Sequence, residues 1–491
     1  MPPPLPPIQG NPFPNQSFVQ APSAPLPAYT QTNPVNTVNM QGPVLQPSGS
    51  GIPDNSVPAA PMEAQAGTTG EVSSLTAPLN PSSIKLGEIG GKALTAGWDD
   101  GFFIKSEDRQ FILRITGQIQ ADYRDYPIKD DTQDIDNFFL RRARFGLEAT
   151  MFNYYEFRFL PDFGQGKAVI QDSYLNVHYW DAFQFTAGKF KQPFSYEQLI
   201  QDRYVPTMER SLIDQLVPAR DIGLMLHGEH LVKDQFDWAV SVSNGEINGD
   251  GDTNNQKDVN ARLAYRPFAS LAEPGAILHG LQVGFAVTTG VEDETLSPDP
   301  IKTPSGVRWL TFNSTVRADG VRNRYSPELA YFWRSLGFAA QYYSEDEKVI
   351  ATALAKQRQD IDIEGGYVLF TWLLTGEERT GYSEQIVPRA SFSPTRPICC
   401  PGAWELVLRA SRLRFDNGIF TPGVGQLADP TKNSSGATEL TTGFNWYFNA
   451  WVRMQFNYEH AWYDDPVQFS IGIAGLHKDS DALMTRFQII F

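Results

Sequence analysis

Arginine is the residue type whose placement in this 491-residue sequence points most directly to a chemistry. A guanidinium group is always charged and presents a planar fork of donors that suits phosphate and carboxylate. Many arginines alternate with apolar residues, so that they share a polar row with Gln, Asp and Thr. The arginines that we place on this row are Arg114, Arg142, Arg144, Arg262, Arg266, Arg409, Arg453 and Arg486. Fixed cations along a low-dielectric wall raise the local anion concentration, which is the chemistry of an anion pathway.

Two adjacent arginines complicate this pattern, because Arg141 falls on the opposite parity from Arg142. A β-bulge at this point would turn both side chains to the same side. Contact with a permeant anion is one interpretation of the arginine row. The other is that the arginines pair with acids such as Glu148, Glu405 and Glu459, and the sequence leaves both open.

The elements that must position these arginines are β-strands. From about residue 110 the sequence alternates apolar and polar residues with period two, as in FILRITGQIQADY at 111–123. Long acidic or Gly/Asn-rich connections alternate with short turns, which suits an antiparallel meander. A repeat of roughly 24 residues predicts about 16 strands over residues 100–491, which is the pattern of a transmembrane antiparallel β-barrel. A soluble β-sandwich or propeller also alternates and stays open from the pattern alone. Aromatic-rich apolar rows and the terminal Phe491 favour the barrel.

The chain divides into three parts by composition. Residues 1–84 hold 18 of the 36 prolines and no Lys or Arg, which predicts a disordered Pro-rich segment. Residues 85–108 form a transition segment, and residues 109–491 form the predicted barrel domain. The start, MPPPLPPIQG, does not resemble a signal peptide. We expect that the targeting segment was removed or that the start was assigned too far downstream.

Composition excludes several other classes of function. Forty Lys and Arg against 56 Asp and Glu give a net charge of −16, which argues against a nucleic-acid partner. The only cysteines, Cys399 and Cys400, are adjacent and cannot build a zinc site or a disulfide framework. No nucleophile motif such as G-x-S-x-G and no cofactor motif is present, so we expect neither an enzyme nor a bound cofactor.

Two clusters resemble metal sites in the order of their residues but lack the arrangement that a metal ion requires. In HGEH, His227 and Glu229 share a strand face while His230 points away, so the ligands do not converge on a zinc ion. A second cluster, Asn248, Asp250, Asp252 and Asn254, has calcium-like spacing. It lacks the downstream bidentate Glu, and we predict a solvated loop and no metal.

Several strings, in order, resemble the phosphate-selective porin O and P family over residues 100–491. They include GQIQADY at 117–123, FFLRRARF at 138–145, the long segment at 170–199 and the terminal LMTRFQIIF. The resemblance implies a usually trimeric, 16-stranded barrel with an arginine-lined anion pathway, in the outer membrane of a Gram-negative-type cell envelope. It further implies contact with outer-membrane lipids and, through Phe491, with the barrel-assembly machinery.

The resemblance also suggests roles for individual residues. Arg141 and Arg142 match the family's paired arginines, Arg262 matches a later pathway arginine, and Asp172 matches an acid that would tune the constriction. Phosphate-specific members carry a basic residue where this chain has Gln118, and two constriction lysines where EQLIQDR at 197–203 has none. Arg203 would replace those lysines. We therefore expect a porin for small anions, such as phosphate, polyphosphate or carboxylated solutes. The alternative is a structural or adhesive barrel with a plugged lumen.

Overall fold

The computed structural model describes residues 84–491 except for 90–91, 99–100, 128–135, 248, 250, 252–253, 271–275, 294, 297, 352–356, 424 and 470–474. The predicted Pro-rich segment therefore lies outside the described residues except for Ile84. So do Asn248, Asp250 and Asp252 of the calcium-like loop.

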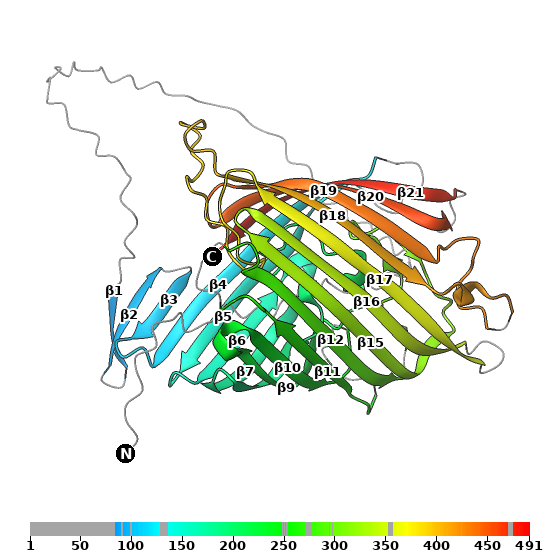
Figure 1. Ribbon diagram of the computed structural model, residues 1–491, viewed down its shortest axis with the longest axis horizontal. Helices are drawn as coiled ribbons and strands as arrows, with labels where there is room; N and C mark the ends of the chain where they lie inside the picture. The colour runs from blue at the N-terminus through cyan, green and yellow to red at the C-terminus, as the bar shows by residue number, and fades with distance from the viewer. Residues whose placement is uncertain are drawn as a thin grey trace, which may run out of the picture. The chain divides into compact units, whose positions relative to one another are not determined.

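Within these ranges the chain forms a closed antiparallel barrel of sixteen strands (Figure 1), which confirms the predicted fold. The first nine strands are β4 (Phe111–Asp125), β5 (Asn137–Met151), β6 (Tyr155–Asp162), β7 (Val169–Trp180), β8 (Phe183–Lys191), β9 (Arg220–His230), β10 (Phe236–Ser243), β11 (Asp258–Tyr265) and β12 (Gly280–Glu292). The other seven are β15 (Val316–Trp333), β16 (Leu336–Ala351), β17 (Gln357–Leu373), β18 (Ala403–Phe415), β19 (Gly436–Tyr447), β20 (Val452–Val467) and β21 (His477–Ile490). Each strand pairs with the next, and β21 pairs with β4 to close the wall.

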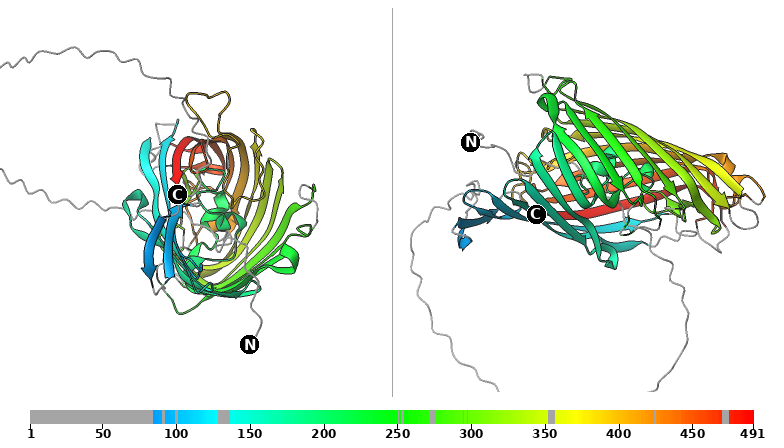
Figure 2. Two further views of the ribbon diagram at one scale, coloured as in Figure 1. Left: turned by 90° about the vertical axis from the view of Figure 1, so that its left-hand side faces the viewer. Right: turned by 90° about the horizontal axis from the view of Figure 1, so that it is seen from below.

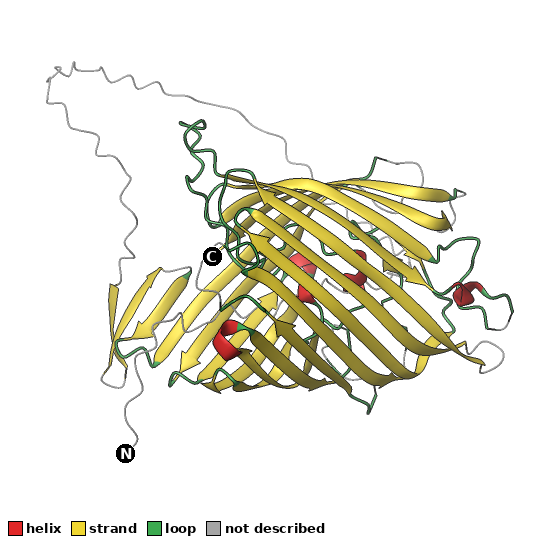
Figure 3. Cartoon of the chain, viewed as in Figure 1, coloured by secondary structure: helices red, strands yellow, loops and turns green. Residues whose placement is uncertain are grey.

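The remaining elements are short and are not among the sixteen strands of the barrel wall (Figure 3). Three strands, β1 (Ile84–Ile89), β2 (Lys92–Trp98) and β3 (Phe102–Ser106), occupy the predicted transition segment, and β13 (Ile301–Lys302) pairs with β14 (Arg308–Leu310). The helical turns are η1 (Gly164–Gly166), α1 (Tyr196–Leu199), η2 (Leu212–Gln215), α2 (Leu231–Asp234) and η3 (Asn417–Phe420). Among the described residues, none of these helices has the length and apolar character needed to cross a membrane.

Side chains alternate across the wall as the period-two pattern predicts. In β18, Leu406 and Leu408 are 43% and 46% exposed, whereas Glu405 and Arg409 are 0% and 1% exposed. The apolar rows therefore face outward and the polar rows face the lumen. This arrangement rules out a sandwich, whose apolar rows would be buried.

The seam of the barrel depends on close contact between the last residue and β4. Gly117 and Phe491 exchange backbone hydrogen bonds, with N···O distances of 2.7 and 3.0 Å. A Cβ atom on Gly117 would come within 2.1 Å of the Phe491 ring, so any other residue here would displace that ring. β21 ends at this point, and β3 pairs with the preceding residues of β4 on the same edge.

The two ends of the barrel differ in their connections. At one end, which we call the short-turn end, strands such as β5 and β6 or β15 and β16 are joined by two or three residues. The other end, the long-loop end, carries connections such as 192–219 and 293–315. One long connection, residues 374–402, lies at the short-turn end between β17 and β18.

Several long connections pack inside the barrel, as the view in Figure 2 shows. The segment 192–219, which we call the constriction loop, buries Phe194, Leu212 and Ile213 against lumen-facing tyrosines such as Tyr343 and Tyr367. Trp309, from the connection 293–315, joins the same apolar cluster. The lumen side of β15–β19 therefore carries an apolar cluster, which the sequence patterns did not predict, beside buried charges such as Arg324 and Arg409. Other arginines gather on β4–β9 and β21.

Candidate functional site

The constriction loop takes its shape from hydrogen bonds within itself and to the wall. Ser195 caps α1 by accepting the Gln198 N–H at 3.2 Å, and it donates to Gln341 of β16 at 3.0 Å. Arg210 donates to the Glu197 carbonyl at 3.0 Å, which ties the two arms of the loop together. A loop fixed in this way presents its other side chains in defined positions.

A β-bulge in β5 places Arg141 and Arg142 together. Gln120 pairs with Arg142 while Ala121 pairs with Leu140, so Arg141 is the extra residue. Both guanidinium groups lie on the lumen side and are buried. The bulge that the sequence suggested is therefore present.

Glu209 of the constriction loop gathers several wall arginines. Arg141 donates to both of its carboxylate oxygens, at 2.8 and 3.0 Å. Arg486 and Arg124 donate to it at 2.9 and 2.8 Å. Burial opposes ionisation of Glu209, but the guanidinium groups of Arg141, Arg486 and Arg124 outweigh it and hold its pKa well below the usual range. Glu209 is therefore a fixed anion that holds the loop to β4, β5 and β21.

Asp202 forms a second anchor of the same kind. It pairs with Arg144 and, at 3.3 Å, with Arg142, and it also accepts a contact from Arg210 at 2.8 Å. Burial raises the pKa of Asp202, but the three guanidinium groups outweigh that effect and lower it overall. Arg144 also donates to Asp162 at 2.6 Å.

Asp214 of the same loop behaves in the opposite way. Burial raises its pKa to about 8, with Glu197 and Asp202 adding to the effect and Arg210 opposing it. Asp214 is therefore mostly protonated near neutral pH.

Arg409 and Arg453 contact different parts of the loop region. Arg409 donates to Thr207 at 2.9 Å and to the Glu209 carbonyl at 2.6 Å, and it pairs with Glu439 at 3.2 Å. Arg453 donates to Gln488 at 3.2 Å and lies 5.8 Å from the Tyr447 ring centroid. Arg409 thus helps to hold the loop.

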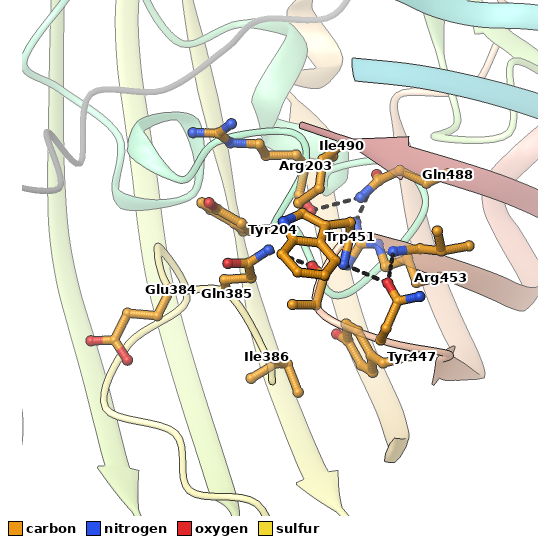
Figure 4. A pocket seen from close by; sticks show the side chains of 13 residues that line it. Arg203, Tyr204, Glu384, Gln385, Ile386, Tyr447, Trp451, Arg453, Gln488 and Ile490 are labelled. Atoms are coloured by element: carbon orange, nitrogen blue, oxygen red, sulfur yellow. Dashed lines mark hydrogen bonds between the residues drawn. The ribbon is translucent and has the colours of Figure 1, made fainter. Parts of the chain in front are cut away.

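Arg203 differs from the arginines that pair with Glu209, Asp202 or Glu439. Arg453 also makes no ion pair within 4.0 Å among the described residues, but it is buried. Arg203 projects from the constriction loop, is only half-buried, donates to Gln201 at 2.6 Å and lies 5.0 Å from the Tyr204 ring centroid. Within the part of the chain that the structure describes, no carboxylate lies within 4.0 Å of its guanidinium group. Figure 4 shows this group pointing away from Trp451 and Arg453, with which Arg203 lines a small pocket.

The remaining predicted residues lie elsewhere on the wall. Asp172 accepts from Arg220 at 2.6 Å and pairs with Arg158 at 3.1 Å. The other three predicted residues contact neighbouring strands: Arg114 stands opposite Glu148, Arg262 pairs with Glu328, and Arg266 pairs with Asp237 at 2.6 Å near the short-turn end. The fold thus places five predicted wall arginines against the constriction loop, which itself carries Arg203: Arg141, Arg142, Arg144, Arg409 and Arg486. Arg266 lies away from this loop.

Pairing with acids therefore describes most of the wall arginines, although the acids are mainly not the ones named from the sequence. Glu148 and Glu405 pair with Arg158 and Arg379, at 2.8 and 2.6 Å, and Glu459 accepts a backbone N–H from Ser305 at 3.1 Å. Sequence reasoning missed the loop acids Asp202 and Glu209, because a loop has no periodicity to mark which side chains point at the wall.

A buried lysine was also missed. Lys191, at the end of β8, donates to the Gln198 carbonyl at 2.7 Å, and no carboxylate among the described residues lies within 4.0 Å of it. It lies on β8, ahead of the segment 197–203 that the resemblance aligns with the constriction lysines, so the sequence match did not point to it.

The two histidines of the HGEH motif point in different directions, as the alternation of side chains along a strand predicts. His227 is buried and faces the lumen, with Nε2 lying 3.2 Å from the Thr186 hydroxyl, whereas His230 is exposed in the turn and contacts Asp234. Among the described residues, no group of three or more His, Cys, Asp or Glu side chains is arranged to hold a metal ion.

Comparison with known proteins gives a family match and a curated relative. The family model described as phosphate-selective porin O and P matches residues 113–491. Porin O of Pseudomonas aeruginosa is 23% identical over 419 residues, which cover 80% of this chain and 91% of that protein.

Solved porin structures resemble the barrel at low sequence identity. OmpT of Vibrio cholerae is 12% identical with a TM-score of 0.46, and covers 78% of this chain and 99% of its own. An anion-selective porin from Comamonas acidovorans is 10% identical with a TM-score of 0.44, over 78% of this chain and 100% of its own. The channel DcaP of Acinetobacter baumannii is 12% identical with a TM-score of 0.44, over 80% and 100%.

Proposed function

Since the chain belongs to the phosphate-selective porin O and P family, we propose that this outer-membrane porin lets small anions diffuse through the narrow region beside the constriction loop. The observation that carries the proposal is the contrast between Arg203 and the wall arginines. Arg141, Arg142 and Arg144 pair with loop carboxylates, whereas the Arg203 guanidinium has no carboxylate within 4.0 Å among the described residues. An uncompensated guanidinium at a constriction attracts anions and repels cations.

Neutral donors support the same proposal. Gln118 and Gln198 stand where phosphate-specific relatives carry basic side chains. Both are buried, and neither side-chain amide nitrogen has a hydrogen-bond partner among the described residues. Such amides can donate to an anion without adding charge, so they favour weaker and less phosphate-specific binding than lysine would give. The proposed solutes are phosphate, polyphosphate and small carboxylates.

Single-channel recording in planar lipid bilayers tests this function. In a potassium chloride gradient the full-length porin should show steady conductance and a reversal potential of the sign that chloride selectivity requires. Added phosphate should reduce the chloride current by competing for the same cations. A cation-selective reversal potential would contradict the proposal.

A second candidate function rests on how much protein fills the barrel. The constriction loop, the connection 293–315 and the connection 374–402, through Tyr382, all contribute to the apolar cluster inside the wall. A structural or adhesive barrel with a plugged lumen would have the same features. It predicts little or no current in the recording described above.

The same proposal extends to how the porin assembles in the membrane. We propose a homotrimer in the outer membrane whose strands contact lipids, and recognition of the last strand, ending in Phe491, by the barrel-assembly machinery. Chemical cross-linking in native membranes should yield a trimer. Deleting Phe491 should lower the amount of folded barrel, because the backbone pairing with Gly117 is lost.

A further inference from the structure

The connection 374–402 crosses from the lumen to the outside of the barrel. Its first part is inside: Arg379 donates to Glu405 at 2.6 Å, and Tyr382 is buried with its ring 5.0 Å from that of Phe332. Its later part continues beyond the strands at the corner between β17 and β18 (Figure 1). We call residues 393–400 the tip segment.

Both ends of the tip segment are attached to aromatic residues of the barrel's outer face. At one end, the Phe392 ring lies 4.8 Å from Trp446 and 5.5 Å from Phe448, and its N–H donates to the Phe448 carbonyl at 2.6 Å. At the other end, the Trp446 indole N–H donates to the Pro401 carbonyl at 2.9 Å. Trp446 also stacks on Trp404 at 5.0 Å. Outward aromatic clusters at a strand end mark the membrane–water interface of an outer-membrane barrel, so the tip segment starts and finishes at that depth.

The tip segment is an ordered turn with an apolar side chain at its apex. The Arg396 N–H donates to the Ser393 carbonyl, and the Cys400 N–H donates to the Arg396 carbonyl, each at 3.1 Å. Ile398 is 97% exposed. Burying such an apolar side chain is favourable, and nothing in the turn's own packing covers it.

The charge of the tip segment suits one kind of surface. Its sequence, SPTRPICC, contains Arg396 and no acid, in a chain whose net charge is −16. An apolar side chain next to a cation, at the depth of an aromatic belt, matches the boundary between acyl chains and phosphate groups. The short-turn end of an outer-membrane barrel faces the periplasm, so the adjoining lipid surface is the periplasmic leaflet.

We propose that the tip segment is a lipid anchor, which inserts Ile398 into the periplasmic leaflet and places the Arg396 guanidinium at phospholipid phosphates. Lipid is the proposed occupant because Phe392 and Trp446 hold the ends of the tip segment at interfacial depth, and because its only charge, Arg396, suits phospholipid phosphates. The inference concerns a surface that the proposed anion pathway does not use. Loss of either function would therefore leave the other intact.

The chain carries a natural probe for this proposal, because its only two cysteines lie in the tip segment. The Cys400→Ser variant of the full-length porin leaves the exposed Cys399 as a single thiol for an environment-sensitive fluorophore. The labelled porin is placed in phosphatidylethanolamine and phosphatidylglycerol vesicles whose acyl chains are brominated near the headgroup. The matched control is Glu107→Cys in a Cys399→Ser, Cys400→Ser background, because Glu107 is exposed in the turn between β3 and β4.

A lipid anchor predicts that the Cys399 label emits at shorter wavelength than the Glu107→Cys label. It also predicts quenching of the Cys399 label by brominated lipid more than by iodide, and the reverse for the control. Adding Ile398→Ser and Arg396→Ser should move the Cys399 label toward the behaviour of the control. Water-like emission with iodide quenching in the unmodified tip would overturn the proposal. A label reached by neither quencher would also overturn it, in favour of burial against a second copy.

Discussion

The wall arginines and the loop arginine Arg203 show two uses of the same side chain. Arg141, Arg142 and Arg144 are buried and face carboxylates that the chain itself supplies from Asp202, Glu209 and Asp162. Arg203 is half-buried and has no such carboxylate among the described residues. Because most of these arginines are paired with carboxylates, an arginine-rich wall does not by itself make a positively charged pathway. We propose that the paired guanidiniums hold the constriction loop in place, and that the net charge of the constriction depends on the few cations without an ion pair.

The largest effect on loop stability and selectivity should follow from removing the wall arginines that pair with the constriction loop. Replacing Arg141 and Arg142 together with Ala leaves Glu209 and Asp202 short of buried partners, and breaking a buried ion pair typically costs about 3–5 kcal/mol. We expect the barrel to stay folded while the loop is released, so that protease cleavage within 192–219 speeds up and anion selectivity falls. Limited proteolysis and reversal potentials measure the two effects. An unchanged cleavage rate would contradict the anchoring role.

Removing the charge of Glu209 separates the two roles of the arginines, because it should lower the stability of the loop but raise anion selectivity. Glu209→Gln keeps the shape but removes the charge that faces Arg141, Arg486 and Arg124. The loop should be less stable by about 1–3 kcal/mol, since charge-assisted hydrogen bonds are weakened. Anion selectivity should rise, because Arg141 loses its paired carboxylate while Arg486 and Arg124 keep only Asp122. A fall in anion selectivity would show that loop position matters more than local charge.

A pH titration should produce a smaller change. Burial raises the pKa of Asp214 to about 8, so this carboxyl is mostly neutral at about pH 7 and mostly ionised at about pH 9. Anion selectivity should therefore fall across this range, and Asp214→Asn should abolish the fall. The free energy of unfolding should also fall as the pH rises from about 4 to about 8. In this range the unfolded carboxyl has lost its proton, whereas the folded carboxyl still holds it. Thermal unfolding at several pH values measures this.

The smallest effect is expected far from the constriction loop. Arg266 pairs with Asp237 near the short-turn end, where both side chains are partly exposed. Arg266→Ala should change stability by no more than about 1 kcal/mol and should leave the reversal potential unchanged. A shift as large as that of the Arg141 and Arg142 variant would mean that selectivity is set along the whole lumen.

The barrel was predictable from sequence because strand alternation is a local property. Leu406 and Arg409 reveal their faces through their immediate neighbours, and so does the bulge at Arg141. The partners of these arginines were not predictable. Arg141 meets Glu209 and Arg486 meets Asp122 only after a loop folds inward and the barrel closes, and no spacing in the sequence encodes either event. The apolar side of the lumen was missed for the same reason, since Tyr343 and Tyr367 are covered by a loop rather than by a strand.

The most direct test of the central claim compares the reversal potential of the full-length porin with that of its Arg203→Ala variant in one potassium chloride gradient, with Arg203→Lys as the charge-preserving control. If Arg203 supplies the uncompensated charge, the variant should lose roughly three- to tenfold in anion over cation permeability, as expected for an interaction of about 1 kcal/mol. The lysine control should retain most of the selectivity. Identical reversal potentials for the wild-type protein and Arg203→Ala would contradict the account.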